Sequence, residues 1–151
     1  MALAMEAAQN AAKAGETPVG AVIVSSDGDV LAALGNAPIS SHDPTAHAEI
    51  RAIRAAAVIA KNYRLTGTSL YVTLEPCAMC AGAISHARVS RLVIAASDPK
   101  GGAVWHGPKF FDQPTCHWRP EIIEGPFEDE SSALLKSFFK ARRRKARSDG
   151  E

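Results

Sequence analysis

The chain has 151 residues, of which 46% are hydrophobic and 22% charged, and its formal net charge is only +1. This size and composition fit one globular domain spanning 1–151, and they exclude general disorder. No apolar run approaches the roughly 20 residues that span a bilayer, so no membrane segment is expected. Three cysteines cannot form a closed disulfide framework, and the spacing Cys77-x-x-Cys80 is typical of metal or redox sites in a reducing compartment. We therefore expect a cytoplasmic protein without a signal peptide.

The small net charge conceals an uneven distribution along the chain. Residues 1–130 carry a net charge of −4, whereas residues 131–151 carry +5. A basic tail on an acidic body can indicate a polyanionic partner. It can equally be the solvated end of a helix, where basic side chains favour the helix dipole. Charge alone leaves both interpretations open.

Hydrophobic periodicity predicts helices alternating with strands after an initial hairpin. The hairpin is expected because Asp27-Gly28 separates two apolar runs. Pro76 is expected in the first turn of a helix. The long connection 97–120 is sufficient for a crossover, so the fourth and fifth strands are expected to be parallel. The predicted elements are a helix at 2–14, strands at 18–24 and 30–34, a polar loop at 36–44, a helix near 46–61, a strand at 69–74, a helix from 76 to about 88, a strand at 91–96, a short helix around 109–112, a strand at 121–123 and a helix at 127–147. Together they predict a helix-flanked mixed sheet of the α/β class.

The final predicted helix has an apolar stripe that would pack against the body of the protein. Leu134, Leu135, Phe138 and Phe139 recur at the spacing of one helix face. Core packing is the expected role of both phenylalanines.

The strongest chemical signal combines one histidine with two cysteines. His47 lies at a predicted helix start, and Cys77 and Cys80 lie three residues apart at another. Imidazole and thiolate are ligands that suit zinc, and three protein ligands leave a fourth position for water. The helix dipole and free amides at a helix start also favour the thiolate forms. The pattern predicts a catalytic zinc site.

Glu49, two residues after His47, is the candidate catalytic residue. A carboxylate beside the metal site that does not bind the metal is suited to move protons between water and a leaving group. A closed structural zinc site would instead need a fourth ligand, with His42, His106, Cys116 and His117 as candidates. A metal-free redox pair would leave His47 and Glu49 without a role. The catalytic interpretation is favoured because the two halves, 28 residues apart, do not fit a compact zinc finger.

These motifs extend into a resemblance over nearly the whole chain. The pattern His-x-Glu followed by Pro-Cys-x-x-Cys is the signature of the zinc-dependent cytidine-deaminase-like superfamily. Further segments resemble the bacterial tRNA adenosine deaminases: Pro18-Val-Gly-Ala-Val22, Asn36, His42-Asp-Pro-Thr-Ala-His-Ala-Glu49, Asn62-Tyr-Arg-Leu65, the stretch from Leu70 to Ile84, Asp98-Pro-Lys-Gly-Gly-Ala-Val104, and Leu134-Leu-Lys-Ser-Phe-Phe-Lys140. The resemblance implies a three-layer α/β/α fold with a central five-stranded mixed sheet.

The resemblance also implies a reaction, a cofactor and a partner. It implies hydrolysis of adenosine to inosine at the wobble position of a tRNA anticodon loop, with one Zn²⁺ per subunit held by His47, Cys77 and Cys80 and with Glu49 as proton shuttle. It further implies a homodimer. The residues that it assigns to substrate binding are Asn36, Ala48, Pro76 and Asp98, and the candidates for RNA-phosphate contacts are Lys140, Arg142, Arg143 and Arg144. The alternatives are a small-molecule deaminase of guanine or cytosine in the same superfamily and a non-catalytic nucleic-acid-binding module.

Two regions depart from the family pattern. Gly35 stands where a larger residue is expected before Asn36, and the segment from Val104 to Trp118 resembles a variant form of the family's downstream loop. Neither region contains a predicted zinc ligand, so the departures concern the contacts around the substrate rather than the metal chemistry. Cys116, within the variant loop, is interpreted as an ordinary loop thiol.

Overall fold

The computed structural model describes residues 1–150 and contains one five-stranded sheet, in the order β2-β1-β3-β4-β5. Its strands are β1 (Gly20–Val24), β2 (Val30–Gly35), β3 (Ser69–Leu74), β4 (Arg91–Ala96) and β5 (Glu121–Glu124). Its helices are α1 (Ala2–Lys13), α2 (Pro38–Ser41), α3 (Ala48–Ala60), α4 (Ala78–His86) and α5 (Glu128–Ser148), with a 3₁₀ turn at Phe110–Asp112.

The sheet is mixed, as the sequence predicts. β1 pairs antiparallel with β2 and β3, whereas β3 with β4 and β4 with β5 are parallel pairs. The expected parallel arrangement of the fourth and fifth strands is therefore confirmed. The central strands supply much of the core, in which Ile23, Leu70 and Leu92 are fully buried.

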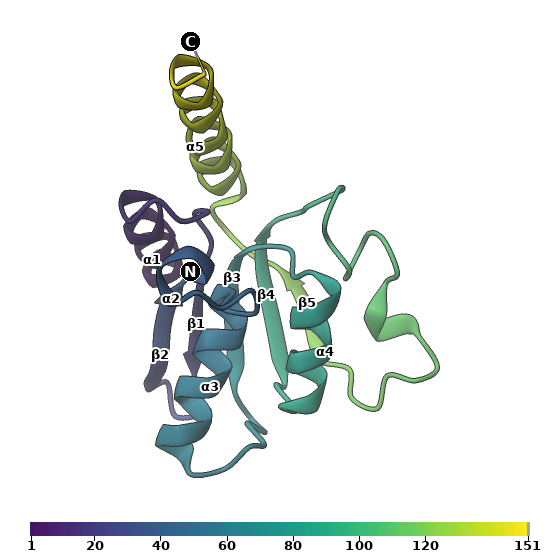
Figure 1. Cartoon of the computed structure of the whole chain (residues 1–151). Coiled ribbons are helices and arrows are strands. Elements are labelled where there is room, and N and C mark those ends of the chain that lie inside the picture. Colours follow the sequence, from purple (N-terminus) through teal and green to yellow (C-terminus); the bar gives the residue numbers. More distant parts are fainter. Residues whose placement is uncertain (151) are drawn as a thin grey trace.

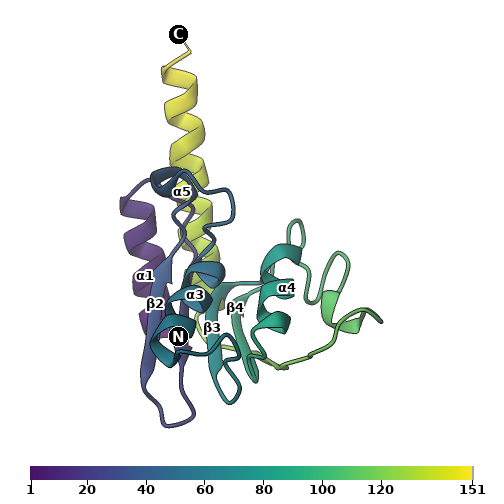
Figure 2. The same ribbon diagram turned by 60° about the horizontal axis from the view of Figure 1, so that its bottom comes forward.

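Helices cover both faces of the sheet, which confirms the three-layer architecture. α3 and α4 lie side by side on one face, whereas α1 and the first turns of α5 pack on the other (Figures 1 and 2). α1 approaches very closely, because its backbone lies against Gly20 of β1 and Gly35 of β2, which are partners across the ladder. A Cβ atom at Gly35 would lie 2.7 Å from the Ala7 oxygen and 2.9 Å from the Ala11 Cβ. The absence of a side chain at Gly35 therefore allows α1 to pack on the sheet edge.

Two local predictions were wrong. The expected polar loop 36–44 contains the short helix α2, whose N-terminal amides are bonded by Glu16 from a distant part of the chain. Pro76 lies outside α4, because Cys77 has an extended conformation at the N-cap and helical geometry begins only at Ala78. The strands at 69–74 and 91–96 have the predicted bounds.

α5 projects well beyond the rest of the molecule (Figures 1 and 2). Only the first part of its apolar stripe meets the body: Leu135 packs against the core, whereas Phe139 remains 39% exposed. Core packing is therefore wrong for Phe139, because the helix has left the sheet at that point. Among residues 1–150, none of the helices is both long and apolar enough to cross a membrane.

Candidate metal centre and substrate pocket

The N-termini of α3 and α4 bring the predicted zinc ligands together. His47 is the N-cap of α3, Cys77 is the N-cap of α4, and Cys80 lies in the first turn of α4. Both N-cap residues have extended backbone, and they lie at the carboxyl end of β3, where the two neighbouring helices start. The parallel placement of these helices on one sheet face converts a 30-residue sequence separation between His47 and Cys77 into direct contact.

The three side chains form a compact set of metal ligands. His47 Nδ1 lies 3.6 Å from Cys77 Sγ and 3.5 Å from Cys80 Sγ, and all three ligand atoms lie within 4.8 Å of one another. One imidazole nitrogen and two sulfurs at this separation suit tetrahedral zinc, which takes nitrogen at about 2.0 Å and sulfur at about 2.3 Å. Cys80 is fully buried and Cys77 is half-buried, so the cluster is open on the Cys77 side. The residues present therefore fit a zinc ion.

The surroundings of the two thiols favour a thiolate on Cys77. A hydrogen bond from Cys80 lowers the pKa of Cys77 to about 5, against the effect of partial burial, and nearby His47 acts in the same direction. The same hydrogen bond, together with burial, raises the pKa of Cys80. A divalent cation at this position would stabilise both thiolates, because cysteines bind metal ions in their deprotonated form.

Glu49 lies beside the cluster and is almost completely buried, with 3% of its surface exposed. Burial raises the pKa of this carboxyl to about 7, although a hydrogen bond from Cys80 opposes the shift. It does not belong to the group of potential metal ligands, although it lines the same cavity as His47 and Cys77. A carboxyl that changes protonation near neutral pH beside a metal site has the properties of a proton shuttle.

A cavity of about 260 Å³ opens onto the cluster. Besides His47, Glu49 and Cys77, it is lined by Asn36, Glu75 and Asp98, with Gly101 at its edge. The cavity is large enough for one nucleobase. The structure therefore brings two of the four predicted substrate-binding residues, Asn36 and Asp98, to the metal centre.

Asn36 connects the pocket to the start of α3. Its Oδ1 accepts a hydrogen bond of 2.7 Å from the Ala48 amide, which leaves the side-chain N–H groups of Asn36 available to a ligand. Ala48 and Pro76 do not line the cavity. The Ala48 amide is bonded to Asn36, and the Pro76 carbonyl accepts from the Ala103 amide at 2.9 Å. Both residues therefore contribute to the pocket indirectly, through backbone hydrogen bonds to Asn36 and Ala103.

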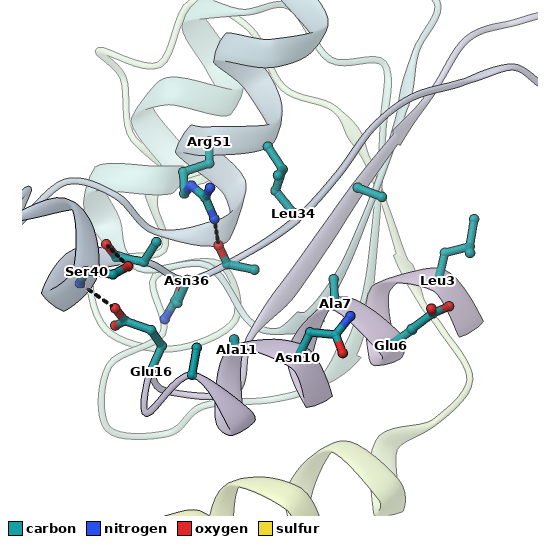
Figure 3. A pocket seen from close by; sticks show the side chains of 14 residues that line it. Leu3, Glu6, Ala7, Asn10, Ala11, Glu16, Leu34, Asn36, Ser40 and Arg51 are labelled. Carbon is teal, nitrogen blue, oxygen red and sulfur yellow. Dashed lines mark hydrogen bonds between the residues drawn. The ribbon is translucent and has the colours of Figure 1, made fainter.

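A second cavity, of about 450 Å³, shares Asn36 with the metal pocket. Figure 3 shows the side chains that line this second cavity. It is bounded by α1 and by the end of β2. Arg51 donates to the Gly35 carbonyl on one side, and Glu16 accepts from the Ser40 amide at 2.8 Å on the other. Gly35, where the sequence departs from the family pattern, lines this second cavity and directly precedes Asn36, the residue that the two cavities share.

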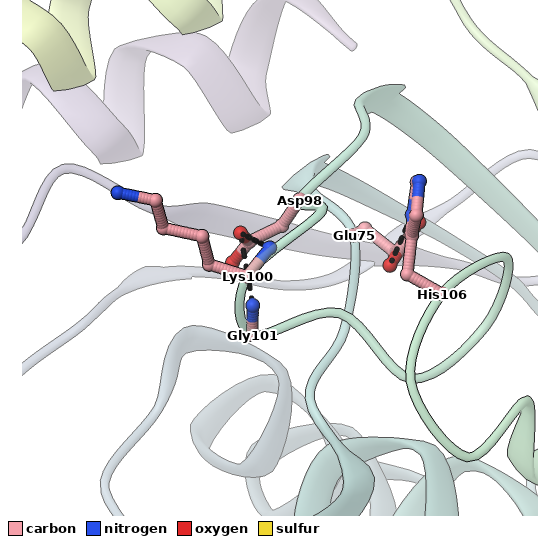
Figure 4. Close-up of polar contacts among 5 residues, drawn as sticks. All are labelled: Glu75, Asp98, Lys100, Gly101 and His106. Atoms are coloured by element: carbon pink, nitrogen blue, oxygen red, sulfur yellow. Dashed lines mark hydrogen bonds and ion pairs between the residues drawn. The ribbon is translucent and has the colours of Figure 1, made fainter.

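Glu75 and His106 form a polar pair at the pocket that the sequence patterns do not predict. His106 Nδ1 lies 2.9 Å from Glu75 Oε1, and the Glu75 side chain is completely buried (Figure 4). His106 is a candidate fourth zinc ligand by residue type, but its Nδ1 is bonded to Glu75 instead. No local signal predicts the pair, because its members are 31 residues apart.

The described residues 1–150 place no fourth protein ligand at the cluster. Their metal-ligand group contains only His47, Cys77 and Cys80. Cys116, another candidate by residue type, is bonded to the Trp118 carbonyl at 3.1 Å. The three-ligand arrangement agrees with an open, catalytic type of zinc site.

The predicted phosphate-binding residues lie on the projecting part of α5. Lys140, Arg142, Arg143 and Arg144 are exposed. Arg142 lies over the Phe138 ring, 5.8 Å from its centroid, and its charge contributes to lowering the pKa of Glu16. The basic part of α5 therefore begins near Glu16 and extends away from the body of the protein.

Comparison with protein families supports the interpretation of this site. Residues 1–96 match the model described as the cytidine and deoxycytidylate deaminase zinc-binding region. The chain is 51% identical over 143 residues to a tRNA-specific adenosine deaminase of Agrobacterium fabrum, covering 95% of this chain and 93% of that protein. It is 47% identical over 143 residues to the tRNA-specific adenosine deaminase of Haemophilus influenzae, covering 95% and 83%.

Solved structures show the same relationship. One structure, from a study of A-to-I editing by tRNA:A34 deaminases at the wobble position of transfer RNA, is similar with a TM-score of 0.87 and 52% identity, over 89% of this chain and 97% of that chain. A guanine deaminase from Bacillus subtilis is more distant, with a TM-score of 0.61 and 33% identity over 93% and 89%.

Proposed function

Because the chain belongs to the tRNA-specific adenosine deaminases of the zinc-dependent cytidine and deoxycytidylate deaminase family, we propose that it hydrolyses adenosine to inosine at the wobble position of a tRNA anticodon loop. The observation that carries this proposal is the buried Glu49 beside the His47, Cys77 and Cys80 cluster, in a pocket large enough for one base. Water replaces the 6-amino group of adenine, and ammonia leaves.

We assign one zinc ion per subunit to His47, Cys77 and Cys80. When bound, zinc lowers the pKa of a water molecule and so supplies a nucleophile at neutral pH. Glu49 takes a proton from the attacking water and delivers it to the departing amino group. Its raised pKa and its burial beside the ligands support both transfers.

Asn36 and Asp98 are the proposed substrate contacts. The free amide nitrogen of Asn36 donates to the nucleoside, while its oxygen is held by Ala48. Asp98 positions the loop that follows β4, because its Oδ1 accepts from the Gly101 amide at 3.1 Å and from the Lys100 amide at 3.2 Å (Figure 4). Ala48 and Pro76 contribute by fixing these two contacts in place.

The basic end of α5 is the proposed site of phosphate contacts. Lys140, Arg142, Arg143 and Arg144 present positive charge to solvent, and Arg142 lies near enough to Glu16 to lower its pKa. Contacts of this kind position an RNA without selecting its sequence, while unpaired bases enter pockets for recognition. An anticodon loop is already single-stranded, so little energy is needed to extrude the target base.

We further propose a homodimer in the cytoplasm. Val58 and Ile59 are 77% and 60% exposed near the end of α3, and their burial against a second subunit would remove apolar surface from water. The three free cysteines and a tRNA substrate agree with a reducing compartment.

The test is a comparison of substrates. We expect inosine and ammonia from an anticodon stem-loop with adenosine at the wobble position, and none from a matched stem-loop in which that adenosine is replaced by guanosine. Free adenosine, guanine and cytosine serve as further substrates. Turnover of free guanine or cytosine, with none of the stem-loop, would identify a small-molecule deaminase instead. This alternative is tested because the chain is also similar to a guanine deaminase.

A further inference from the structure

We propose that Glu75 and His106 form a positioning pair that holds the loop 98–102 against the substrate pocket and thereby determines how tightly the pocket binds its nucleotide. This inference rests on the proposed function, since the nucleotide is that of the RNA substrate. The pair joins two segments: one leads to the zinc ligand Cys77, and the other carries Asp98 and Gly101. No part of the zinc chemistry requires the pair.

Glu75 is held from two sides. Its amide donates to the Ala96 carbonyl at 2.8 Å, which extends the pairing of β3 with β4 beyond the last residue of β3. Its carboxylate accepts from His106 Nδ1, at 2.9 Å for Oε1 and 3.3 Å for Oε2. The Glu75 side chain has no exposed surface, whereas that of His106 is 36% exposed. A buried carboxylate is costly unless it is hydrogen-bonded, so His106 is important for keeping Glu75 in this position.

The Glu75 carboxylate lies directly against the backbone of the loop. A Cβ atom at Gly102 would overlap the carboxylate and would lie 2.5 Å from the Asp98 carbonyl. The Gly102 amide donates to that same carbonyl at 2.8 Å, and this bond closes the turn that begins at Asp98. The turn that presents Asp98 and Gly101 to the cavity therefore rests on Glu75.

The far end of the loop is fixed in the same region. The Ala103 amide donates to the Pro76 carbonyl at 2.9 Å, one residue from Glu75. His106, three residues later, returns to the Glu75 side chain (Figure 4). Loss of the imidazole would leave the Ala103 bond in place but remove the only side-chain bond between His106 and the segment 75–77 within residues 1–150. We therefore expect a looser loop rather than an unfolded protein.

His106 belongs to the segment from Val104 to Trp118, which resembles a variant form of the family's downstream loop. A residue of this segment therefore helps to fix the pocket wall. The pair bonds neither Glu49 nor any of the three metal ligands directly. The expected effect is therefore on substrate binding rather than on the chemical step.

His106→Asn and His106→Ala separate this role from general stabilisation. The asparagine side-chain nitrogen occupies about the place of Nδ1 and keeps the bond to Glu75, whereas alanine removes it. We expect His106→Ala to raise KM for the anticodon stem-loop about 10-fold, with kcat changed less than about 3-fold. We expect His106→Asn and the control His117→Ala, which removes another imidazole of the same loop, to stay within about 2-fold of the parent.

A second measurement needs no substrate. We expect hydrogen exchange at the amides of 101–103 to accelerate in His106→Ala and to stay near the parent rate in His106→Asn, with zinc content unchanged in both. Equal hydrogen-exchange rates in all variants, or a fall in kcat with unchanged KM, would refute the proposed positioning role of Glu75 and His106. If the variants show the expected exchange pattern but the parent protein does not deaminate the stem-loop, the result would contradict the proposed function and not the role of the pair.

Discussion

Individual side chains in this protein take their chemistry from burial and from close neighbours. Glu49 has an ordinary carboxyl group, yet burial raises its pKa to about 7, and the neighbouring Cys80 limits the shift. The pKa of Cys77 shifts in the opposite direction, down to about 5, because Cys80 donates a hydrogen bond to it. Neither value follows from residue type. Both follow from placing one carboxyl group and two thiols at the start of two adjacent helices.

The first prediction concerns Glu49. Glu49→Gln keeps the size of the side chain and removes its ability to carry a proton, so we expect turnover of the stem-loop to fall at least about 100-fold while zinc remains at about one ion per chain. Turnover is measured by inosine formation and zinc by elemental analysis.

His47→Ala is the matched control for this prediction. It removes a proposed ligand and is expected to lose both zinc and turnover. Near-parent activity in Glu49→Gln would refute the shuttle, and loss of zinc in that variant would show that Glu49 is a ligand instead.

At the scale of single elements, short segments depend on partners from elsewhere in the chain. α2 has only four residues, and its N-cap residue, Ala37, has no side-chain acceptor. Glu16 supplies the missing acceptor, at 2.8 Å from the Ser40 amide and 3.3 Å from the Ile39 amide. The local sequence around Pro38 therefore predicts a loop, and a remote carboxylate makes it a helix.

Glu16→Ala tests this cap. We expect the free energy of unfolding to fall by about 1 kcal/mol near pH 7, the usual value for a lost helix cap, as measured by urea denaturation. Burial alone would raise the pKa of Glu16, but hydrogen bonds from Ser40 and Ile39 outweigh it, with a contribution from Arg142, and lower the pKa below 4.5. The cap therefore stabilises fully above about pH 4.5, and its contribution disappears as the pH falls through the folded-state pKa.

The difference between parent and Glu16→Ala should accordingly shrink near pH 3. Glu6→Ala, which removes an exposed glutamate from α1, is the control and should change stability by less than about 0.5 kcal/mol at either pH. A loss in Glu16→Ala that is the same at both pH values would assign the effect to packing rather than to the charge.

The whole molecule separates the pocket from the segment that carries an excess of positive charge, residues 131–151. The sheet and its flanking helices build the metal centre, whereas the basic residues lie on the part of α5 that projects beyond the body (Figure 1). Such an extension gains little from packing, since Phe139 remains exposed. The basic extension of α5 could contact a partner that reaches beyond the pocket and carries many negative charges, such as RNA.

Simultaneous replacement of Arg142, Arg143 and Arg144 by glutamine tests that role. We expect weaker binding of the anticodon stem-loop and a flatter dependence of log affinity on log salt. The slope should fall by about 0.7 to 0.9 for each phosphate that the variant no longer neutralises. Fluorescence anisotropy at several salt concentrations provides the measurement.

Replacement of the same three residues by lysine keeps the charge and the helix, and it should preserve the salt dependence. An unchanged slope in the glutamine variant would show that the basic end of α5 is only a solvated helix terminus.

Local sequence patterns were sufficient to predict the parallel pairing of β4 with β5, two strands with their bounds, and the candidate residues His47, Glu49, Cys77 and Cys80. These signals are local: hydrophobic period, turn residues and ligand types at short spacing. The folded chain was needed to show that Glu16 forms α2, that Gly35 allows α1 to pack on the sheet edge, and that His106 supports Glu75 behind the pocket. Those contacts join residues 23 to 31 positions apart, or separate elements, and no local pattern encodes them. Likewise, the sequence alone locates an excess of positive charge in residues 131–151, and the structure adds that these basic residues lie on a helix that extends away from the body.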